Sequence, residues 1–320
     1  MADRVALLTD SDRFPFAASE LEALSNAGVH PVALDGHDAE DIVAAGADAA
    51  ALVVYHAHVD APLLDRLNRC RVVARCGAGY DNIDAQAARA RGVEVVYVPD
   101  YGTDDVADHT LALILACARK LLVCDRSVRR GQWPGYPELA PMHRLRGSLL
   151  GLLGFGRIAA AVAERAQAFG MNVIAHDPYV TDDEMALKNV TPVSFDELLR
   201  CADILSIHAP LTPDTRGLIG DAELSRLRPG AILVNTSRGA IVDEVALAAA
   251  VQTGRVAAGL DVFSESPLDP AHALVAHDGA VLTPHSAAFT EEALTEVRVR
   301  VIDDVLRVLS GEPALHPVPA

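Results

Sequence analysis

Short apolar runs alternate along this chain with longer stretches in which apolar residues recur every three or four positions. A short run bounded by glycine or polar residues is typical of a buried strand, and the wider spacing is typical of an amphipathic helix. The first hundred residues alternate in this way, with helices expected at 19–26 and 84–91. The strands expected there are residues 4–8, 31–34, 50–55, 72–75 and 93–98. This alternation predicts an α/β unit with a flavodoxin-like parallel sheet.

The pattern is interrupted at residues 99–103, Pro-Asp-Tyr-Gly-Thr, which we interpret as a linker. Thr103 is expected to cap a long helix that runs to about Leu122, with acidic residues in its first turn, where the helix dipole favours them. Residues 129–141 are rich in glycine and proline and are expected to be irregular. Further strands are expected at residues 149–153, 172–176, 204–208, 231–235, 257–262 and 280–283, alternating with helices.

The stretch from Ser148 to Asp177 has the pattern of a nucleotide-binding strand–helix–strand unit. Gly154 permits the turn after the first strand, Gly156 lets the backbone approach a pyrophosphate, and Ala159 takes the third small position, where the helix packs on the strand. Asp177 ends the second strand 18 residues after Ala159, near the spacing of about 20 typical of a ribose-binding carboxylate. The phosphates would lie on the exposed N–H groups at the helix start. These features together predict dinucleotide binding rather than a chance glycine turn.

We therefore predict an α/β fold in which a Rossmann dinucleotide-binding domain is inserted into a smaller flavodoxin-like α/β substrate domain. The Rossmann domain is expected at residues 101–287. The substrate domain is expected to comprise residues 1–100 and 288–320, because an amphipathic helix expected at 291–309 would return to the first sheet. The length of 320 residues, at about 150 per domain, also indicates two domains.

Composition and charge narrow the possible partners. The formal net charge of −17 and the lack of a long basic run disfavour nucleic acid and anionic membranes. No apolar run reaches the roughly 18 residues that a membrane span needs, and the first ten residues resemble a strand start rather than a signal peptide. The five cysteines form no Cys-x-x-Cys pair, which indicates free thiols in a reducing compartment. We therefore expect a cytoplasmic protein.

Residues suited to chemistry follow several of the predicted strands. The loop Gly77-Ala78-Gly79 presents consecutive N–H groups that suit a small anion, although a simple turn has the same appearance. Arg238 follows a strand where its guanidinium can clamp a carboxylate, although most arginines are solvated surface residues. His285 suits a general acid near neutral pH, with a structural histidine as the alternative. Because ligands bind at the carboxyl ends of parallel strands, the common position of these residues favours a functional role.

A metal site is not expected. The run Tyr55-His56-Ala57-His58 contains two imidazoles, but no third ligand is in register with them.

Five further stretches, together with the glycine turn, are specific to one family. They are Arg75–Asp84, Val106–Leu113, His208–Thr215, Val234–Gly239 and Thr283–His285. Over nearly its whole length the chain resembles the D-isomer-specific 2-hydroxyacid dehydrogenases. Within that family, Val98–Thr103 and Asp177–Tyr179 most resemble the bacterial branch akin to C-terminal-binding proteins and phosphoglycerate dehydrogenase.

The resemblance implies a role for each candidate residue. Arg238 would hold the carboxylate and carbonyl of a substrate, and His285 would give a proton to the carbonyl oxygen as a hydride arrives from NAD(H). Backbone groups of Gly77, Ala78 and Gly79 would bind the substrate carboxylate. The residues expected to bind the cofactor are Gly154, Gly156, Arg157, Ile158, Asp177, His208, Ala209, Pro210, Thr215, Thr236, Ser237, Asp261 and His285. Of these, Asp261 would orient the nicotinamide carboxamide and Asp177 the adenosine ribose.

One catalytic position departs from the family pattern. The family has a glutamate directly before the proline of Asp-Val-Phe-x-x-Glu-Pro, whereas this chain has Ser266 there, with Glu265 one residue earlier. A carboxylate beside His285 would raise its pKa and hold its tautomer, and a serine would supply only a neutral hydrogen bond. Both Glu265 and Ser266 therefore remain candidate partners of His285.

Two functions from different classes follow. The first is an NAD-dependent reductase of small 2-oxo acids that produces D-2-hydroxy acids, and the sequence does not name the substrate side chain. The alternative is a non-catalytic NAD(H)-binding sensor or scaffold resembling C-terminal-binding proteins, which the missing glutamate would allow. In either case a homodimer is expected, because the helix from Thr103 and the segment 129–141 add more apolar surface than one Rossmann domain needs.

Overall fold

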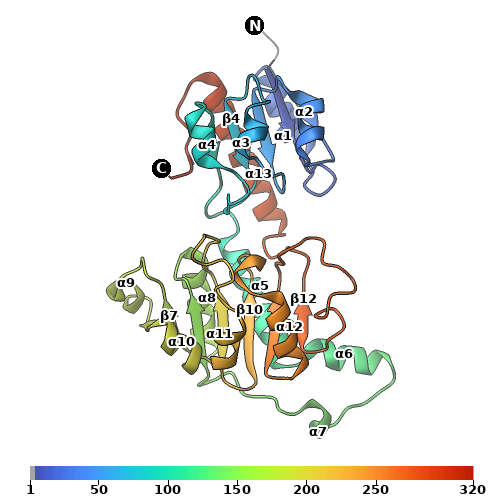
Figure 1. The fold of residues 1–320 in the computed structure, drawn as a ribbon, viewed down its shortest axis with the longest axis vertical. Coiled ribbons are helices and arrows are strands. Elements are labelled where there is room, and N and C mark those ends of the chain that lie inside the picture. The colour runs from blue at the N-terminus through green and yellow to red at the C-terminus, as the bar shows by residue number, and fades with distance from the viewer. Residues whose placement is uncertain (1–3, 320) are drawn as a thin grey trace. The chain divides into compact units, whose positions relative to one another are not determined.

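The computed structural model describes residues 4–319, which form two compact units. One unit consists of the chain up to Gly102 together with the segment from Thr290 onward, and the other is Thr103–Phe289 (Figure 1). Each unit has one fully parallel sheet with helices on both faces. The predicted fold class, a Rossmann unit inserted into a flavodoxin-like unit, is confirmed.

The first unit contains a five-stranded parallel sheet in the order β2-β1-β3-β4-β5. This is the flavodoxin-like order, with its topological switch point between β1 and β3. The strands are β1 (Arg4–Leu8), β2 (Val29–Ala33), β3 (Ala51–Val54), β4 (Val72–Arg75) and β5 (Glu94–Val96). Strands β3 and β4 are buried at every position, as expected for central strands covered on both faces.

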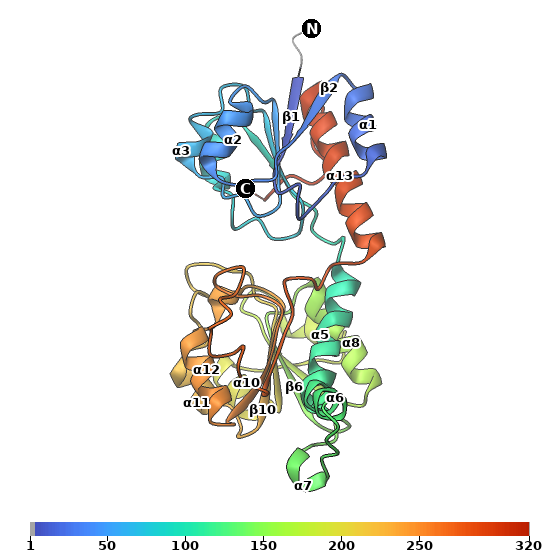
Figure 2. The ribbon, with the colours of Figure 1, turned by 90° about the vertical axis from the view of Figure 1, so that its right-hand side faces the viewer.

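Helices cover both faces of this sheet (Figure 2). On one face lie α2 (Ala39–Gly46), α3 (Ala61–Leu64) and α4 (Ala85–Ala90), which contribute the fully or nearly fully buried side chains Ile42, Leu63 and Ala88 to one core. On the other face lie α1 (Ala18–Asn26) and α13 (Glu291–Ser310), and Leu24, Val297 and Val301 belong to the second core. The last helix therefore returns to the first sheet, so both ends of the chain contribute to this unit.

The second unit contains a seven-stranded parallel sheet in the order β12-β11-β10-β9-β6-β7-β8. Read from β8, this is the Rossmann order 3-2-1-4-5-6 with one additional strand. The strands are β6 (Leu149–Leu153), β7 (Asn172–His176), β8 (Thr191–Pro192), β9 (Ile204–Ile207), β10 (Ala231–Asn235), β11 (Val256–Leu260) and β12 (Ala280–Leu282). The order reverses between β6 and β9, so a ligand crevice is expected at the carboxyl ends of these two strands.

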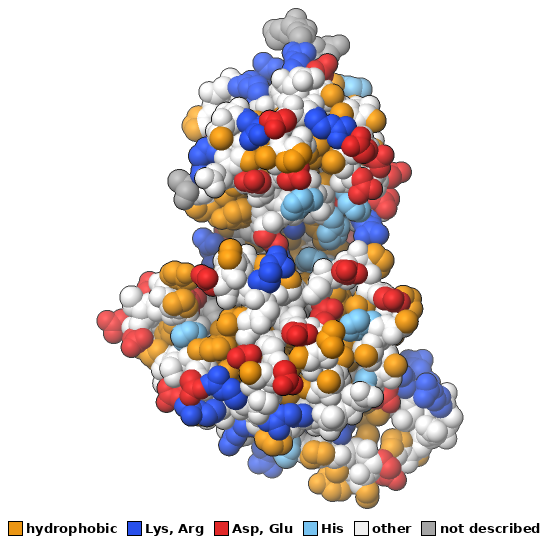
Figure 3. All heavy atoms as spheres, viewed as in Figure 1, with side chains coloured by type: hydrophobic (Ala, Val, Ile, Leu, Met, Phe, Trp, Pro, Cys, Tyr) orange, Lys and Arg blue, Asp and Glu red, His pale blue; other side chains and the backbone are white. Residues whose placement is uncertain are grey.

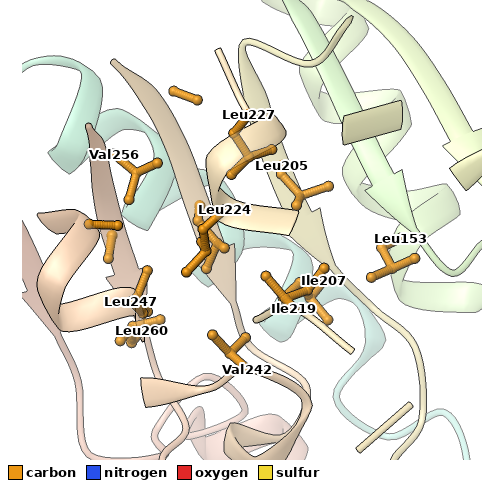
Figure 4. Packing of buried hydrophobic residues seen from close by; sticks show 14 of the residues in the cluster. Leu153, Leu205, Ile207, Ile219, Leu224, Leu227, Val242, Leu247, Val256 and Leu260 are labelled. Carbon is orange, nitrogen blue, oxygen red and sulfur yellow. The ribbon is translucent and has the colours of Figure 1, made fainter. Parts of the chain in front are cut away.

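Helices α10 (Phe195–Cys201), α11 (Asp221–Arg226) and α12 (Glu244–Gln252) cover one face of the seven-stranded sheet. Their side chains Leu224 and Leu247 pack with Leu205, Ile207 and Leu260 of the strands (Figure 4). Helices α5 (Thr103–Ala118) and α8 (Arg157–Ala168) cover the other face, and α9 (Asp182–Ala186) follows β7. Because both faces are covered, the exposed parts of the sheet are its two ends.

The long helix predicted from Thr103 to about Leu122 is wrong at both ends. Thr103 is the first residue of α5 rather than its cap, and α5 ends at Ala118. Lys120 adopts a left-handed conformation (φ +49°), after which α6 (Leu121–Arg129) begins. The apolar pattern continues across this break without a glycine or proline, so periodicity alone gives no sign of it. The segment predicted to be irregular contains the short helix α7 (Tyr136–Leu139).

Two surface properties bear on the expected partners. Among residues 4–319, no helix is long and apolar enough to cross a membrane. On the face drawn in Figure 3, lysine and arginine side chains are interspersed with acidic ones and form no continuous basic surface.

A comparison of Gly154 with Gly217 tests whether the turn after β6 lies too close to a neighbouring backbone to accept a side chain. Both have a left-handed backbone (φ +88° and +66°), but a Cβ on Gly154 would lie 2.7 Å from the backbone nitrogen of Ala209, whereas a Cβ on Gly217 would meet nothing within 4 Å. We expect both alanine variants to lose about 1–2 kcal/mol of stability through backbone strain. Gly154→Ala should lose about 1–3 kcal/mol more, because backbone faces backbone and cannot move aside cheaply. Urea unfolding of the two variants measures the difference, and equal losses would contradict the close approach.

Candidate active site

Six loops meet at the carboxyl edge of the seven-stranded sheet. In sheet order they contain Thr283–His285 after β12, Asp261 after β11, Thr236–Gly239 after β10, His208–Pro210 after β9, Gly154–Gly156 after β6 and Asp177 after β7. Every candidate residue of this unit lies in these loops or at the start of α8, with Thr215 further along the loop after β9 and Glu265 and Ser266 further along the loop after β11. This edge is where an open α/β sheet binds its ligand.

The start of α8 is built to bind an anion. Gly156 is its N-cap, in an extended conformation, and no side chain caps the helix. The first N–H groups of a helix have no acceptor within the helix, so those at Arg157 and Ile158 are available to an anionic ligand. Asp177 accepts from the Phe155 N–H at 2.8 Å and from the Tyr179 N–H at 2.8 Å. Its carboxylate is therefore fixed beside the glycine turn and retains lone pairs for a ribose hydroxyl.

The loop after β9 is fixed by its own polar groups. The His208 ring nitrogen Nε2 lies 2.8 Å from the Ser206 hydroxyl, and burial lowers the pKa of His208 from 6.5 to about 4. His208 is therefore neutral near pH 7 and cannot serve as a proton donor with a matched pKa. The Thr215 hydroxyl donates to the Pro210 carbonyl at 2.6 Å, and the Ser237 hydroxyl donates to the Ala209 carbonyl.

The loop that carries Arg238 is organised by Asn235. The Asn235 amide donates to the Arg238 carbonyl at 2.9 Å, and its oxygen accepts from the Ser237 N–H at 3.0 Å. Arg238 itself donates from Nη1 to the Ser237 carbonyl at 2.8 Å. The next residue, Gly239, lies directly against the backbone of Phe263, where even a Cβ could not fit. The loops after β10 and β11 are therefore in backbone contact.

His285 is held in a left-handed conformation (φ +56°), which is uncommon for a residue with a side chain. Its N–H donates to the Asp261 carbonyl at 2.8 Å. The Asp261 carboxylate is fully buried and accepts from the Thr283 hydroxyl at 2.6 Å, the Ser286 N–H at 2.9 Å and the Ala287 N–H at 3.0 Å. The Asp261 carboxylate thus holds the loop of His285 in place through these hydrogen bonds. Its contact with a nicotinamide carboxamide remains a prediction.

The two candidate partners of His285 lie on an exposed, irregular loop. Within the part of the chain that the structure describes, the side chains of Glu265 and Ser266 make no hydrogen bond or ion pair. The loop is held instead by Glu244, which accepts from the Ser264 N–H and lies 3.8 Å from His272. The geometry therefore assigns the partner role to neither residue.

In the first unit, the Gly77–Gly79 loop follows β4. The Gly77 N–H already donates to the Arg75 carbonyl at 2.9 Å, whereas the Ala78 and Gly79 N–H groups donate to no acceptor among the described residues. Two of the three predicted donors are therefore available to an anion. No group of three His, Cys, Asp or Glu side chains within residues 4–319 is arranged to hold a metal ion.

Sequence reasoning missed three polar side chains at these edges. His109 Nε2 lies 3.0 Å from the Thr283 hydroxyl, and the fully buried Thr110 hydroxyl lies 3.0 Å from that of Thr236. In the first unit, the fully buried carboxylate of Asp10 accepts from three successive N–H groups, those of residues 55–57. The signal for His109 and Thr110 is a polar pair directly before the apolar run from Leu111 to Ala118. Asp10 gives no comparable signal, because an aspartate after a strand is usually a turn residue.

The sheet order, the uncapped helix after a glycine turn and the carboxylate after β7 define the second unit as a dinucleotide-binding domain. Residues 111–287 match the model of one family, described as "D-isomer specific 2-hydroxyacid dehydrogenase, NAD binding domain". The chain is 43% identical over 281 residues to the D-3-phosphoglycerate dehydrogenase of Mycobacterium leprae, covering 87% of this chain and 53% of that protein. It is 42% identical over 260 residues to the glyoxylate reductase of Aeropyrum pernix, covering 79% and 78%.

The fold of a solved relative agrees with this match. The crystal structure of D-lactate dehydrogenase from Aquifex aeolicus, complexed with NAD and lactic acid, has a TM-score of 0.85 at 26% identity and covers 96% of both chains. The protein therefore belongs to the D-isomer specific 2-hydroxyacid dehydrogenase family, and its second unit is an NAD-binding domain. The chain spans 53–58% of the length of the first phosphoglycerate dehydrogenases that it matches.

The lowered pKa of His208 makes a prediction about stability. Because the unfolded state takes up the proton near pH 6.5 and the folded state only near pH 4, the folded state loses stability as the pH falls between these values. We expect wild type to lose on the order of 2 kcal/mol relative to His208→Asn across this range. Urea unfolding of both proteins at pH 7.5 and pH 4.5 measures this loss. Parallel pH profiles of the two proteins would contradict it.

Proposed function

We propose that this protein is an NAD-dependent oxidoreductase that interconverts a small 2-oxo acid and the corresponding D-2-hydroxy acid. One observation carries the proposal. His285 is held in an uncommon left-handed conformation by the buried Asp261, at the same sheet edge as the Arg238 loop and the uncapped start of α8. Such backbone strain persists only where the surroundings enforce it, and it clusters at functional sites.

The chemistry requires both side chains. NADH, when bound, would supply a hydride for C2 of the 2-oxo acid, so the side chains around the C2 oxygen must stabilise the negative charge that develops there. Arg238 is a permanent cation with a bidentate fork, suited to the carboxylate and the developing oxyanion. His285 in its protonated form transfers a proton to that oxygen, which completes the hydroxyl group. In the first unit, the Ala78 and Gly79 N–H groups carry the proposed carboxylate-binding role.

The coenzyme is proposed to be NAD rather than NADP. The Asp177 carboxylate is fixed beside the glycine turn, where it would accept from a ribose hydroxyl and repel a 2′-phosphate. The residues that follow, Pro178 and the exposed Tyr179, provide no cation to replace that interaction.

The substrate is proposed only as a class. Relatives are named for phosphoglycerate, glyoxylate and lactate, which share a carboxylate next to the reacting carbon. Arg238, His285 and the Ala78 and Gly79 N–H groups are suited to the carboxylate and the reacting carbon that these substrates share. They do not define which side chain the substrate carries.

A second candidate function is supported by the loop that contains Glu265 and Ser266. Because neither side chain is engaged within the described residues, a protein that binds NAD(H) without turnover, as a sensor or scaffold, would be consistent with this loop. The oxidation of NADH with a panel of 2-oxo acids, measured beside NADH binding, separates the two. Tight binding without turnover on any acid would favour the sensor.

A homodimer is proposed to form through α6 and α7. Trp133 is 87% exposed and Tyr136 is 75% exposed, and Leu121 and Val128 of α6 are each 51% exposed. Hydrophobic side chains also gather around α7 in Figure 3. Large exposed apolar groups in one segment are typical of an interaction surface.

The role of His285 as the proton donor is tested by its replacement. His285→Ala should lower kcat for 2-oxo acid reduction by the roughly 10²- to 10⁴-fold typical of a lost general acid. NADH affinity should change little, because the helix start and Asp177 lie on other loops. Steady-state kinetics and NADH fluorescence titration measure both quantities. Retained turnover in His285→Ala would refute the mechanism.

The partner of His285 is tested by Glu265→Gln and Ser266→Ala. A large loss of kcat only in Glu265→Gln would mean that the carboxylate acts from one position earlier in the loop. A large loss only in Ser266→Ala would mean that a neutral hydrogen bond suffices. If both variants keep the wild-type pH profile of kcat, His285 works without either residue.

The dimer is tested by placing charges on the exposed segment. The double variant Trp133→Glu, Tyr136→Glu should be monomeric at micromolar concentration by light scattering, because charged residues disfavour the core of an interface. The matched control is Tyr179→Glu, which changes a residue that is 89% exposed in a different loop and should leave the oligomeric state unchanged. A monomeric wild-type protein would reject the proposed dimer.

A further inference from the structure

Helix α5 contacts two of the strand-end loops through adjacent residues. His109 Nε2 lies 3.0 Å from the hydroxyl of Thr283, two residues before the proposed acid. The Thr110 hydroxyl lies 3.0 Å from that of Thr236, two residues before the proposed cation. One turn of a single helix therefore touches the loops that carry both proposed catalytic side chains.

The direction of the hydrogen bonds at His109 follows from Asp261. A carboxylate only accepts, and the Thr283 hydroxyl lies 2.6 Å from Asp261 Oδ1 but 3.4 Å from the Leu260 carbonyl oxygen. Thr283 therefore donates its proton to Asp261, and its oxygen accepts from His109. Nε2 of His109 must carry a proton. Its distance of 3.5 Å from Asp261 Oδ1 is long for a direct bond, so Thr283 mediates the contact.

The same reasoning applies to Thr110. Its hydroxyl lies 2.7 Å from the Val106 carbonyl oxygen, which only accepts, so the Thr110 proton points to the helix backbone. The Thr110 oxygen then accepts from the hydroxyl of Thr236. Thr110 is fully buried, so loss of its hydroxyl would leave the Thr236 hydroxyl without this acceptor and no water could readily replace it.

We propose that His109 and Thr110 are positioning residues of the active site, and that His109 acts on His285 through Thr283 and Asp261. This inference rests on the proposed function for its kinetic consequence, but its structural part does not. The ordered chain from His109 through Thr283 ends on the carboxylate that binds the N–H groups of residues 286 and 287, directly after His285. Loss of the His109 donor frees the Thr283 hydroxyl to rotate and loosens that carboxylate.

The test compares His109→Leu, which removes the donor, with His109→Gln, which keeps an N–H at a similar reach. His109→Leu should lower kcat by about 10- to 100-fold, as expected of a small misplacement of a reacting group. The KM for NADH should change much less, because the pyrophosphate and ribose contacts expected at the start of α8 and at Asp177 lie on other loops. The primary isotope effect on kcat with NADH deuterated at the transferred position should rise in His109→Leu. His109→Gln should recover most of the lost kcat.

The second arm tests the loop of Arg238. Thr110→Val preserves shape and removes only the hydroxyl, and should raise the KM for the 2-oxo acid together with a lower kcat. The matched control, Thr253→Val, removes an exposed hydroxyl that bonds only to its own helix and should leave both constants unchanged.

The matched control for His109 is His316→Leu. His316 Nδ1 lies 2.8 Å from the buried Asp304 carboxylate, and both histidine side chains are 23% exposed. His316→Leu therefore also removes a histidine that supports a buried aspartate, but in the other unit and by a direct contact. It should keep the wild-type kcat and isotope effect even if its melting temperature falls.

An NMR measurement that does not require catalytic turnover separates this inference from the proposed function. In protein labelled with ¹³C at histidine Cε1, the His285 resonance is assigned by its absence in His285→Gln. That resonance should shift in His109→Leu and remain in place in His316→Leu. If wild type reduces no 2-oxo acid but the resonance shifts, the proposed function fails and the positioning role holds.

Two results would overturn the inference. The first is a His109→Leu protein with the kcat and His285 resonance of wild type. The second is an equal loss of kcat in His109→Leu and His316→Leu, because that loss would report general destabilisation.

Discussion

The buried carboxylate of Asp261 is the constraint on which the carboxyl edge of the second unit depends. Removing a carboxylate from water costs several kcal/mol, and no lysine or arginine among residues 4–319 pairs with this one. Three donors offset that cost, at about 1.5–3 kcal/mol for each hydrogen bond to a charged group. All three come from residues within two positions of His285. The loop that makes these three bonds holds His285 with its left-handed backbone.

The first unit also has a buried carboxylate that accepts from backbone N–H groups of a loop at the end of a strand. Asp10 is also fully buried and accepts from three successive N–H groups of the loop after β3. Here the aspartate itself has a left-handed backbone (φ +58°). In both units a carboxylate of the protein takes the position that an anion would take in a backbone anion site. The available donors, at Ala78, Gly79 and the start of α8, are the ones that no aspartate occupies. The buried aspartates thereby determine which N–H groups remain for ligands.

The sequence predicts the regular parts of this structure well and the contacts between distant segments poorly. Strands β1, β4, β6, β7 and β10 have the bounds predicted for them, because each contains an apolar run that ends at a polar residue or a glycine. The break at Lys120 was missed because it leaves the apolar pattern intact, and β8 was missed because it is a two-residue edge strand that contains a proline. Residues that follow strands could be placed at one edge from topology alone. The contact of His109 with Thr283 spans 174 residues and depends on how α5 packs, which no local pattern encodes.

The loops of this edge also hold one another. Phe155 bonds to Asp177, Gly154 lies against Ala209, the Ser237 hydroxyl bonds to the Ala209 carbonyl, Gly239 lies against Phe263, and His285 bonds to Asp261. Loops at a sheet edge are usually the parts of a protein that open independently and most readily. Here each loop is tied to the next across most of the sheet, so opening one removes support from its neighbours. The edge should therefore behave as a single cooperative unit in hydrogen exchange, with its amide protons exchanging as a group rather than loop by loop.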